Sequence, residues 1–287
     1  MISAQPAHVA STSPKIIFVT GANQGLGLAI IQVAALRDPE PIYVLASRKR
    51  LAGEEAAEKL RELGVTAKIE VVELDVTNDE QIEAAVNLVK TKFGKLDDPS
   101  SHPDGAPDRG TAATVLINNA GISGPMRPPT SESLSETRAR YNTILDTNLT
   151  SVAVLTRALT PALHRSPAPK VINVSSGLGS MSNALARKMG RAPAYGASKV
   201  GLNGLSVHLQ VEENDRVEAG ISVEEPRIKT FVVAPGLLRT SFTGFSEKAK
   251  DPKDGAEAIV RLALEEVEFE GGSFLEWADG KLKRVPW

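Results

Sequence analysis

The feature that most constrains the fold of this chain is a regular alternation of short apolar runs with longer helical patterns. A strand that is apolar at nearly every position is buried on both faces, and strands that alternate with helices pair in parallel. The pattern therefore predicts an α/β fold, a doubly wound parallel sheet of about seven strands with helices on both faces. The expected strands include 15–20, 42–46, 67–74, 114–118, 170–174 and 227–234, and the expected helices begin with 25–36, 50–63 and 79–93.

Length and composition predict one domain. The chain has 287 residues, of which 41% are hydrophobic and 24% charged, and this is enough to bury one sizeable core. Residues 15–287 are expected to form that single domain, and residues 1–14, rich in Ala, Ser, Thr and Pro, a flexible tail. Residues 97–111, rich in Pro, Asp, Gly and Ser, are expected to be an exposed loop insertion. Residues 177–193 fit either a short helix over a pocket or a plain surface loop.

Charge and residue usage exclude several classes of function. The 33 Lys and Arg nearly balance the 35 Asp and Glu, so no basic field attracts nucleic acid or anionic lipid. The chain has no Cys and its four His are far apart, which argues against a metal site. It also lacks a secretory signal and any run of the roughly 18 to 20 apolar residues that cross a bilayer. We expect a soluble, cytoplasmic protein that acts on a small molecule without a metal.

A glycine-rich turn joins the first predicted strand to the first predicted helix, with the sequence TGANQGLG over 20–27. In this position the free N–H groups of the turn and the helix dipole favour a pyrophosphate. Gly21 permits the tight turn, Gly25 lets the backbone approach the phosphates, and Gly27 lets the helix pack on the sheet. A Rossmann-type dinucleotide site is therefore predicted here, and Asn23, Gln24 and Leu26 complete its turn.

The end of the second strand predicts which dinucleotide binds. A carboxylate there would hold the free ribose hydroxyls of NAD(H), but the sequence has Ala46, Ser47 and Arg48. A serine hydroxyl and a guanidinium suit a 2′-phosphate, so NADP(H) is favoured over NAD(H). The alternative is that Arg48 and the next two basic residues form a solvated start to the second helix.

Six motifs follow one another in a fixed order along the chain. They are the turn 20–27, Asn118-Asn119-Ala120-Gly121, Asn148, Ser175-Ser176, Tyr195 with Lys199, and Pro235-Gly236-Leu237-Leu238-Arg239-Thr240. In this order they resemble the short-chain dehydrogenase/reductase family over about residues 15–287. Within this family, the glycine turn, the segment that begins at Asp251 and the final Trp287 are most similar to NADPH-dependent carbonyl reductases.

The resemblance implies further cofactor contacts. The Asp75 carboxylate and the Val76 N–H would hold the adenine, although Asp75 also fits a simple capping role. Asn118 also fits a purely structural role that ties strands together. The remaining contacts implied are Asn119, Ala120 and Gly121 beside the ribose, and Pro235, Leu238 and Thr240 near the nicotinamide and phosphates.

Tyr195 and Lys199 are four residues apart on a predicted helix, so both side chains emerge on one face. Reduction of a carbonyl builds negative charge on its oxygen, so the site needs a proton donor. We expect Tyr195 to be this acid/base, with the Lys199 ammonium lowering its pKa. The resemblance also implies that Lys199 holds the nicotinamide ribose, that Ser176 rather than Ser175 bonds the substrate oxygen, and that Asn148 holds a water of the proton relay.

The sequence departs from the family at two places, and it leaves the substrate open. Ser176 and Tyr195 are 19 positions apart, several more than usual, and Gln24 stands where many NADP-preferring members have a basic residue. The segments expected to line the substrate pocket are 122–137, 177–193 and 237–250. The favoured function is an NADP(H)-dependent oxidoreductase acting on a small carbonyl or alcohol, as a monomer or homodimer. The alternatives are a non-catalytic NADP(H) sensor or scaffold and a dedicated biosynthetic alcohol dehydrogenase.

Overall fold

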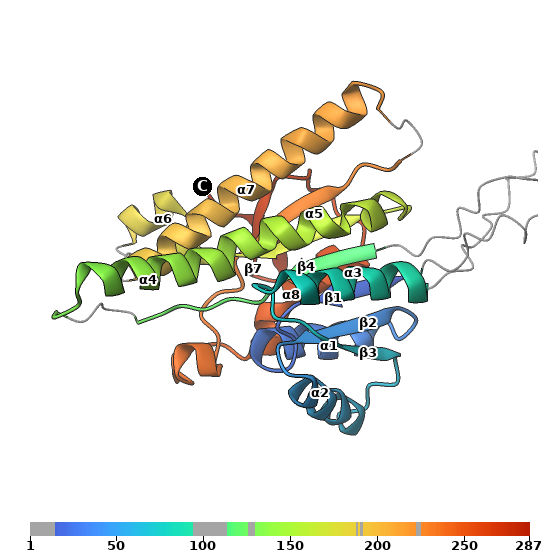
Figure 1. The fold of residues 1–287 in the computed structure, drawn as a ribbon, viewed down its shortest axis with the longest axis horizontal. Helices are drawn as coiled ribbons and strands as arrows, with labels where there is room; N and C mark the ends of the chain where they lie inside the picture. Colours follow the sequence, from blue (N-terminus) through green and yellow to red (C-terminus); the bar gives the residue numbers. More distant parts are fainter. Residues whose placement is uncertain (1–14, 94–113, 126–129, 188, 190–191, 222–224) are drawn as a thin grey trace, which may run out of the picture.

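Eight strands form one sheet in the order β3-β2-β1-β4-β5-β6-β7-β8 (Figure 1). The computed structural model describes residues 15–93, 114–125, 130–187, 189, 192–221 and 225–287. All neighbouring strands pair in parallel except β7 and β8, so the predicted parallel sheet is confirmed. The strands are β1 Ile16–Val19, β2 Ile42–Ser47, β3 Ile69–Glu73, β4 Thr114–Asn118, β5 Lys170–Val174, β6 Lys229–Val233, β7 Phe274–Ala278 and β8 Lys281–Arg284.

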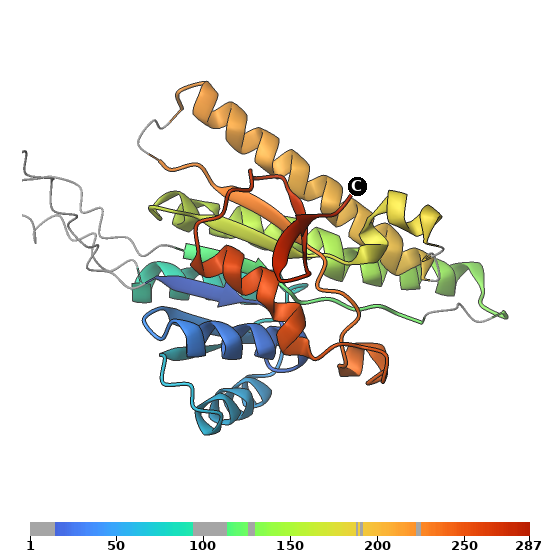
Figure 2. The ribbon, with the colours of Figure 1, turned by 180° about the vertical axis from the view of Figure 1, so that it is seen from behind.

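Helices cover both faces of the sheet, as the two opposite views show (Figures 1 and 2). The helices α1 Gly25–Arg37, α2 Arg50–Glu62 and α8 Pro252–Leu264 lie on one face. The helices α3 Asp79–Phe93, α5 Ser151–His164 and α7 Pro193–Glu218 lie on the other, α4 Leu134–Leu145 packs against α7, and the short α6 Met181–Ala186 precedes α7.

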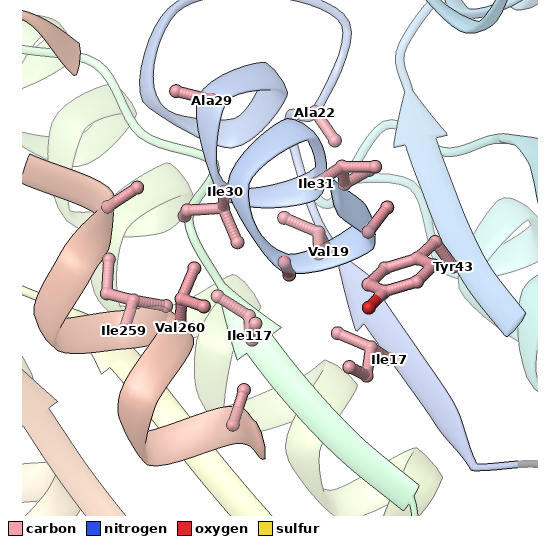
Figure 3. Close-up of a cluster of buried hydrophobic side chains, with 14 of the residues drawn as sticks. Ile17, Val19, Ala22, Ala29, Ile30, Ile31, Tyr43, Ile117, Ile259 and Val260 are labelled. Atoms are coloured by element: carbon pink, nitrogen blue, oxygen red, sulfur yellow. The ribbon is translucent and has the colours of Figure 1, made fainter. Parts of the chain in front are cut away.

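Successive side chains of β1 point to opposite faces of the sheet, so the strand packs against both helical layers. Ile17 and Val19 face α1 and α8, where they meet a cluster that includes Ile30 and Ile259 (Figure 3), whereas Phe18 faces α3 and α5. Each fully buried isoleucine of this kind stabilises the fold by ~1.5–3 kcal/mol. The two cores hold the carboxyl ends of the strands at one edge, and the strand order reverses there between β1 and β4. A ligand crevice is expected at such a switch point.

The interface of α7 with the sheet is polar near its centre. The Asn118 amide donates to Asn173 Oδ1 at 2.8 Å and to Thr156 Oγ1 at 3.1 Å, and the Asn173 amide donates to Ser206 Oγ at 2.9 Å. These four side chains are buried, and a satisfied buried network of this kind fixes one arrangement of its elements. Asn118 therefore has the structural role that the sequence left open, because it ties β4 to β5 and α5.

The strand β8 was not predicted. Its sequence, KLKR, is mostly charged, and it pairs antiparallel with β7 at the edge of the sheet through the turn at Asp279 and Gly280. Charged residues are common on edge strands, where one side of the strand meets water. The predicted tail 1–14 and the predicted insertion 97–111 lie outside the described residues. No helix in the described part of the chain is long and apolar enough to cross a membrane.

Candidate active site

The turn after β1 lies at the carboxyl edge of the sheet, and glycines and hydrogen bonds determine its backbone conformation. Gly21 and Gly25 have left-handed backbones, with φ of 61° and 56°. A Cβ on Gly27 would lie 2.5 Å from the Gly21 carbonyl oxygen and 2.6 Å from Asn119 Nδ2, so only glycine fits. The Asn119 amide donates to the carbonyls of Thr20 and Gly21, at 2.8 and 3.2 Å. Asn119, which directly follows the neighbouring strand β4, therefore holds the backbone of this turn in place.

The first turn of α1 suits an anion. Gln24 at its N-cap position makes no side-chain capping bond, and the first turn holds no acidic residue. The first N–H groups of a helix have no partner within the helix, and negative charge is favoured beside them. Asn23, Gln24 and Leu26 are all at least partly exposed around this helix start.

The end of β2 departs from the simplest expectation. Ser47 is 1% exposed, and its hydroxyl donates to the Lys49 carbonyl and accepts from the Lys49 N–H. Its side chain therefore holds the turn into α2. Arg48 is exposed, whereas the neighbouring Arg50 pairs with Glu54 at 2.9 Å. Of the two residues predicted to contact a 2′-phosphate, Arg48 is thus the one that presents its side chain to solvent.

The turn after β3 is built around Asp75. Its Oδ1 accepts bonds from the Thr77 N–H at 3.0 Å and the Thr77 hydroxyl at 2.8 Å. The Asp75 N–H donates to Gln81 Oε1 at 2.6 Å, and Val76 is buried. The carboxylate thus has the capping role that the sequence had left as an alternative, and it is not fully buried.

Tyr195 and Lys199 lie on the first turns of α7, which begins at Pro193. The Lys199 ammonium is 5.7 Å from the centroid of the Tyr195 ring and donates to the carbonyl of Val174, the last residue of β5, at 2.8 Å. Burial lowers the pKa of Lys199 to about 8. The two side chains therefore lie together at the end of β5, as their spacing predicted.

The pKa of Tyr195 differs from the sequence expectation. Burial raises it to about 12, and a hydrogen bond with Ser176 opposes this rise only in part. The spacing of the two residues predicts instead that the Lys199 ammonium lowers this pKa. That expectation is wrong for the protein by itself, because the loss of water around the partly buried phenol is the largest influence on its ionisation.

Asn148 lies in a π-helical turn, Asp146–Thr150, between α4 and α5, and is completely buried. Its amide forms a pair of bonds with the backbone of Ile122, each 2.8 Å long, and also donates to Ser198 Oγ at 2.9 Å. The Ser198 hydroxyl in turn donates to the Tyr195 carbonyl at 2.7 Å. A surface asparagine that bonds only locally, which the sequence by itself also allows at this position, is therefore excluded. Asn148 connects the segment after β4 to the helix that carries Tyr195.

The turn after β5 places the two serines differently. The Ser175 hydroxyl donates to Asn203 Oδ1 at 2.6 Å, and the Asn203 amide donates to the Gly179 carbonyl at 3.0 Å. Ser176 is partly exposed and accepts from the Leu178 N–H at 3.2 Å. Ser175 thus holds the turn, and Ser176 is the serine beside Tyr195. No sequence motif marks Asn203, although it follows Lys199 by four residues on the same face of α7.

The turn after β6 meets the turn after β1. A Cβ on Gly25 would lie 3.4 Å from Thr240 Cγ2, and Gly236 has a φ of 86°. Leu238 and Thr240 are buried, and Pro235 is partly buried. The segment predicted to bind the pyrophosphate and the segment predicted to lie near the nicotinamide and phosphates are therefore adjacent.

An aromatic side chain contacts Tyr195, and metal-binding side chains do not cluster in the part of the chain that the structure describes. The Phe242 ring lies edge-on to the Tyr195 ring, with centroids 5.6 Å apart, and no sequence motif had marked Phe242. Among the described residues, no group of three or more His, Asp or Glu side chains could hold a metal ion.

The fold and these turns define a doubly wound, Rossmann-like α/β protein. The chain belongs to the short-chain dehydrogenase/reductase family, because residues 15–98 and 105–251 match the family described as short chain dehydrogenase. It is therefore an oxidoreductase acting on CH–OH and C=O groups.

Named relatives support this assignment. A short-chain dehydrogenase/reductase of Aspergillus fumigatus is 49% identical over 96% of this chain and 99% of its own length. A short-chain dehydrogenase of Penicillium roqueforti is 31% identical over 90% of this chain and 91% of its own length. The NADPH-bound carbonyl reductase from chicken fatty liver has a similar fold, with a TM-score of 0.72 and 22% identity over 96% of this chain and 100% of that protein.

Proposed function

We propose that this protein is an NADP(H)-dependent oxidoreductase that transfers a hydride between the nicotinamide and a small carbonyl or alcohol substrate. The observation that carries the proposal is the grouping of Ser176, Tyr195 and Lys199 at the end of β5, beside turns suited to a dinucleotide. This grouping unites a proton donor, an oxygen-binding hydroxyl and a buried cation, which are the parts that carbonyl reduction needs.

The residues at the carboxyl edge fit NADP(H). Gly21 and Gly25 have left-handed backbones, a side chain does not fit at Gly27, and the uncapped start of α1 suits the pyrophosphate. Arg48 would pair with the 2′-phosphate, and the end of β2 has no carboxylate that would repel this phosphate. The likeness to the NADPH-bound chicken protein adds support. The other residues assigned to the cofactor are Asp75, Val76, Asn119, Ala120, Gly121, Pro235, Leu238 and Thr240.

When bound, the nicotinamide supplies or accepts the hydride. In the direction of reduction, the Tyr195 hydroxyl gives its proton to the substrate oxygen while the Ser176 hydroxyl donates a hydrogen bond to that oxygen. A pKa of about 12 keeps Tyr195 protonated at neutral pH, so the phenol carries the proton that reduction consumes. Lys199 would hold the nicotinamide ribose, and Asn148 would support the path by which Tyr195 is reprotonated.

The test is incubation of the protein with NADPH and a panel of aldehydes, ketones and quinones. We expect loss of NADPH absorbance with at least one class of carbonyl. Tight NADPH binding without turnover of any substrate would refute the proposal and favour a sensor or scaffold. Turnover confined to one bulky ketone would favour the dedicated biosynthetic enzyme. The single domain 15–287, the cytoplasmic location and the choice between monomer and homodimer stay predictions.

A further inference from the structure

The segment 237–250 is a closed loop with a fixed base. The Arg239 N–H donates to the Lys250 carbonyl at 2.8 Å, and the Lys250 N–H donates to the Leu237 carbonyl at 2.9 Å. Leu238 is 5% exposed and packs so closely on Gly255 of α8 that a Cβ there would lie 2.5 Å from its side chain. The base of the loop is therefore anchored to the body of the protein, and the loop can hold side chains at defined positions.

Inside this loop, a short 3₁₀ turn presents two phenylalanines. Thr240 caps the turn Ser241–Thr243, and its carbonyl accepts from the Phe245 N–H at 2.9 Å. Gly244 and Phe245 then adopt left-handed backbones in succession, with φ of 62° and 54°. The turn is visible as the short orange coil at the lower left of Figure 1.

The backbone of Phe245 is unusual for its side chain. Among the described residues other than glycine, only Phe245 and Asp279 have a positive φ. Aspartate tolerates this conformation and lies in the tight turn between β7 and β8, but a bulky aromatic residue is an outlier there. Strain of this kind persists where the surrounding structure imposes it, and it is concentrated at ligand-binding sites. Packing inside the protein does not explain this strained backbone, because Phe245 is 65% exposed.

The other phenylalanine contacts the proposed acid/base. The ring of Phe242 lies edge-on to that of Tyr195, at 5.6 Å and 61°, while 44% of its own surface faces solvent. Leu237, at the base of the loop, is 54% exposed. Across the site, a Cβ on Gly177, next to Ser176, would lie 3.1 Å from the Met189 methyl group. Apolar side chains thus flank the reacting hydroxyls from two segments, as in sites that bind apolar ligands.

From these contacts we propose that Phe242 and Phe245 form an aromatic wall that binds the apolar group of the substrate. The substrate class is a carbonyl compound with an aromatic or extended apolar group beside the reacting carbon. This inference rests on the proposed function and names the substrate class of the same site. Phe242 acts as a specificity-determining residue, because the group attached to the carbonyl lies against its ring while the oxygen meets Tyr195 and Ser176.

The loop also carries cations, and these define the competing prediction. Arg239, Lys248 and Lys250 are exposed, and a substrate with a carboxylate would suit them better than an apolar one. The side chain that contacts the Tyr195 ring from this loop is that of Phe242. The apolar class is therefore favoured, and a carboxylated probe belongs in the test.

The experiment measures kcat and KM of the full chain with NADPH and four aldehydes: propanal, benzaldehyde, carboxybenzaldehyde and naphthaldehyde. We expect kcat/KM of the wild-type protein to rise from propanal to naphthaldehyde. Phe242→Ala should lower kcat/KM for naphthaldehyde about tenfold or more, mainly through KM, and that for propanal less than about threefold. Phe242→Leu, which keeps apolar volume without the ring, should fall between the two.

Controls separate a specificity effect from damage to the fold. Leu63→Ala removes a large apolar side chain that is similarly exposed, 45%, at the end of α2, and should leave all four rates unchanged. NADPH affinity, followed by NADPH fluorescence, should be unchanged in Phe242→Ala. If that variant does not fold, Phe242→Leu and Phe245→Ala carry the same test.

Three results would overturn the inference. They are a wild-type preference for propanal, a preference for carboxybenzaldehyde over benzaldehyde, and an equal loss of propanal and naphthaldehyde reduction in Phe242→Ala. Each of them leaves the proposed function standing, because reduction of a carbonyl has then been measured. NADPH binding with no reduction of any aldehyde or ketone refutes the proposed function itself, and the inference falls with it.

Discussion

The Lys199 ammonium donates a 2.8 Å hydrogen bond to the main-chain carbonyl of Val174, the last residue of β5. The bond fixes the cation at the strand end that leads into the turn of Ser176. Lys199 is only 4% exposed, and its burial is what lowers its pKa to about 8. The protein therefore keeps a charge at its site that the fold by itself disfavours.

Lys199→Met should make the protein more stable at neutral pH while removing its activity. The pKa of Lys199 is about 8 in the folded protein and 10.5 when exposed, so the unfolded chain binds the proton more tightly. The penalty is complete below pH 8 and disappears as the pH rises to about 10.5. Urea denaturation should show a gain in unfolding free energy of up to ~3 kcal/mol at neutral pH that shrinks toward pH 10. A gain independent of pH would contradict this account.

Tyr195→Phe should abolish turnover without preventing cofactor binding. The variant keeps the ring that contacts Phe242 and loses only the hydroxyl that bonds Ser176. The loss of a general acid lowers kcat by ~10²–10⁴-fold. Steady-state kinetics measure the loss, and NADPH fluorescence provides the control for binding. Retained activity would show that Tyr195 is not the acid/base.

Arg48→Asp should erode the preference for NADPH. The change removes the exposed cation at the end of β2 and places there the carboxylate that suits free ribose hydroxyls. The ratio of kcat/KM for NADPH to that for NADH should fall by about tenfold or more, because hydrogen bonds to charged groups contribute about 1.5–3 kcal/mol. Arg50→Asp makes the same charge change at a residue paired with Glu54, and is the matched control. Equal effects of the two substitutions would mean that Arg48 does not bind the phosphate.

Asn203→Ala should destabilise the turn after β5 by ~1–3 kcal/mol, because it leaves the buried Ser175 hydroxyl and Gly179 carbonyl without their partner. Adding Ser175→Ala should cost less than the sum of the two single substitutions, because they share one interaction. Urea denaturation of the two single variants and the double variant measures this coupling. Strict additivity would show that the 2.6 Å bond between the two side chains contributes little.

Phe245→Gly should leave the protein as stable as the wild type or more stable. Glycine adopts the left-handed backbone at no steric cost, whereas phenylalanine is strained there by ~1–2 kcal/mol. The gain is offset in part by the greater freedom of glycine in the unfolded chain. Thermal unfolding measures the difference. A clear loss of stability would mean that Phe245 serves internal packing and not a ligand.

The prediction from sequence was most accurate where local patterns and burial agree. The apolar runs at β1, β4 and β5 predicted a parallel sheet. Strands of such a sheet are buried on both faces, so they are apolar at nearly every position and do not alternate with polar residues. Similarly, the four-residue spacing of Tyr195 and Lys199 was enough to place them on one helical face. The charged strand β8 was missed, because its pairing depends on β7 and not on its own hydrophobicity.

By itself, the sequence determined the sheet, the glycine turn and the family, because these depend on periodicity, on residues without a Cβ, and on motifs in a fixed order. Only the tertiary structure decided that Asn119 bonds the Gly21 carbonyl, that Asn203 holds Ser175, and that Phe242 lies against Tyr195. It also decided the ionisation of Tyr195, which burial controls more strongly than its spacing from Lys199 had suggested. Contacts between distant segments and the removal of water exist only once the chain has packed, and no local pattern encodes them.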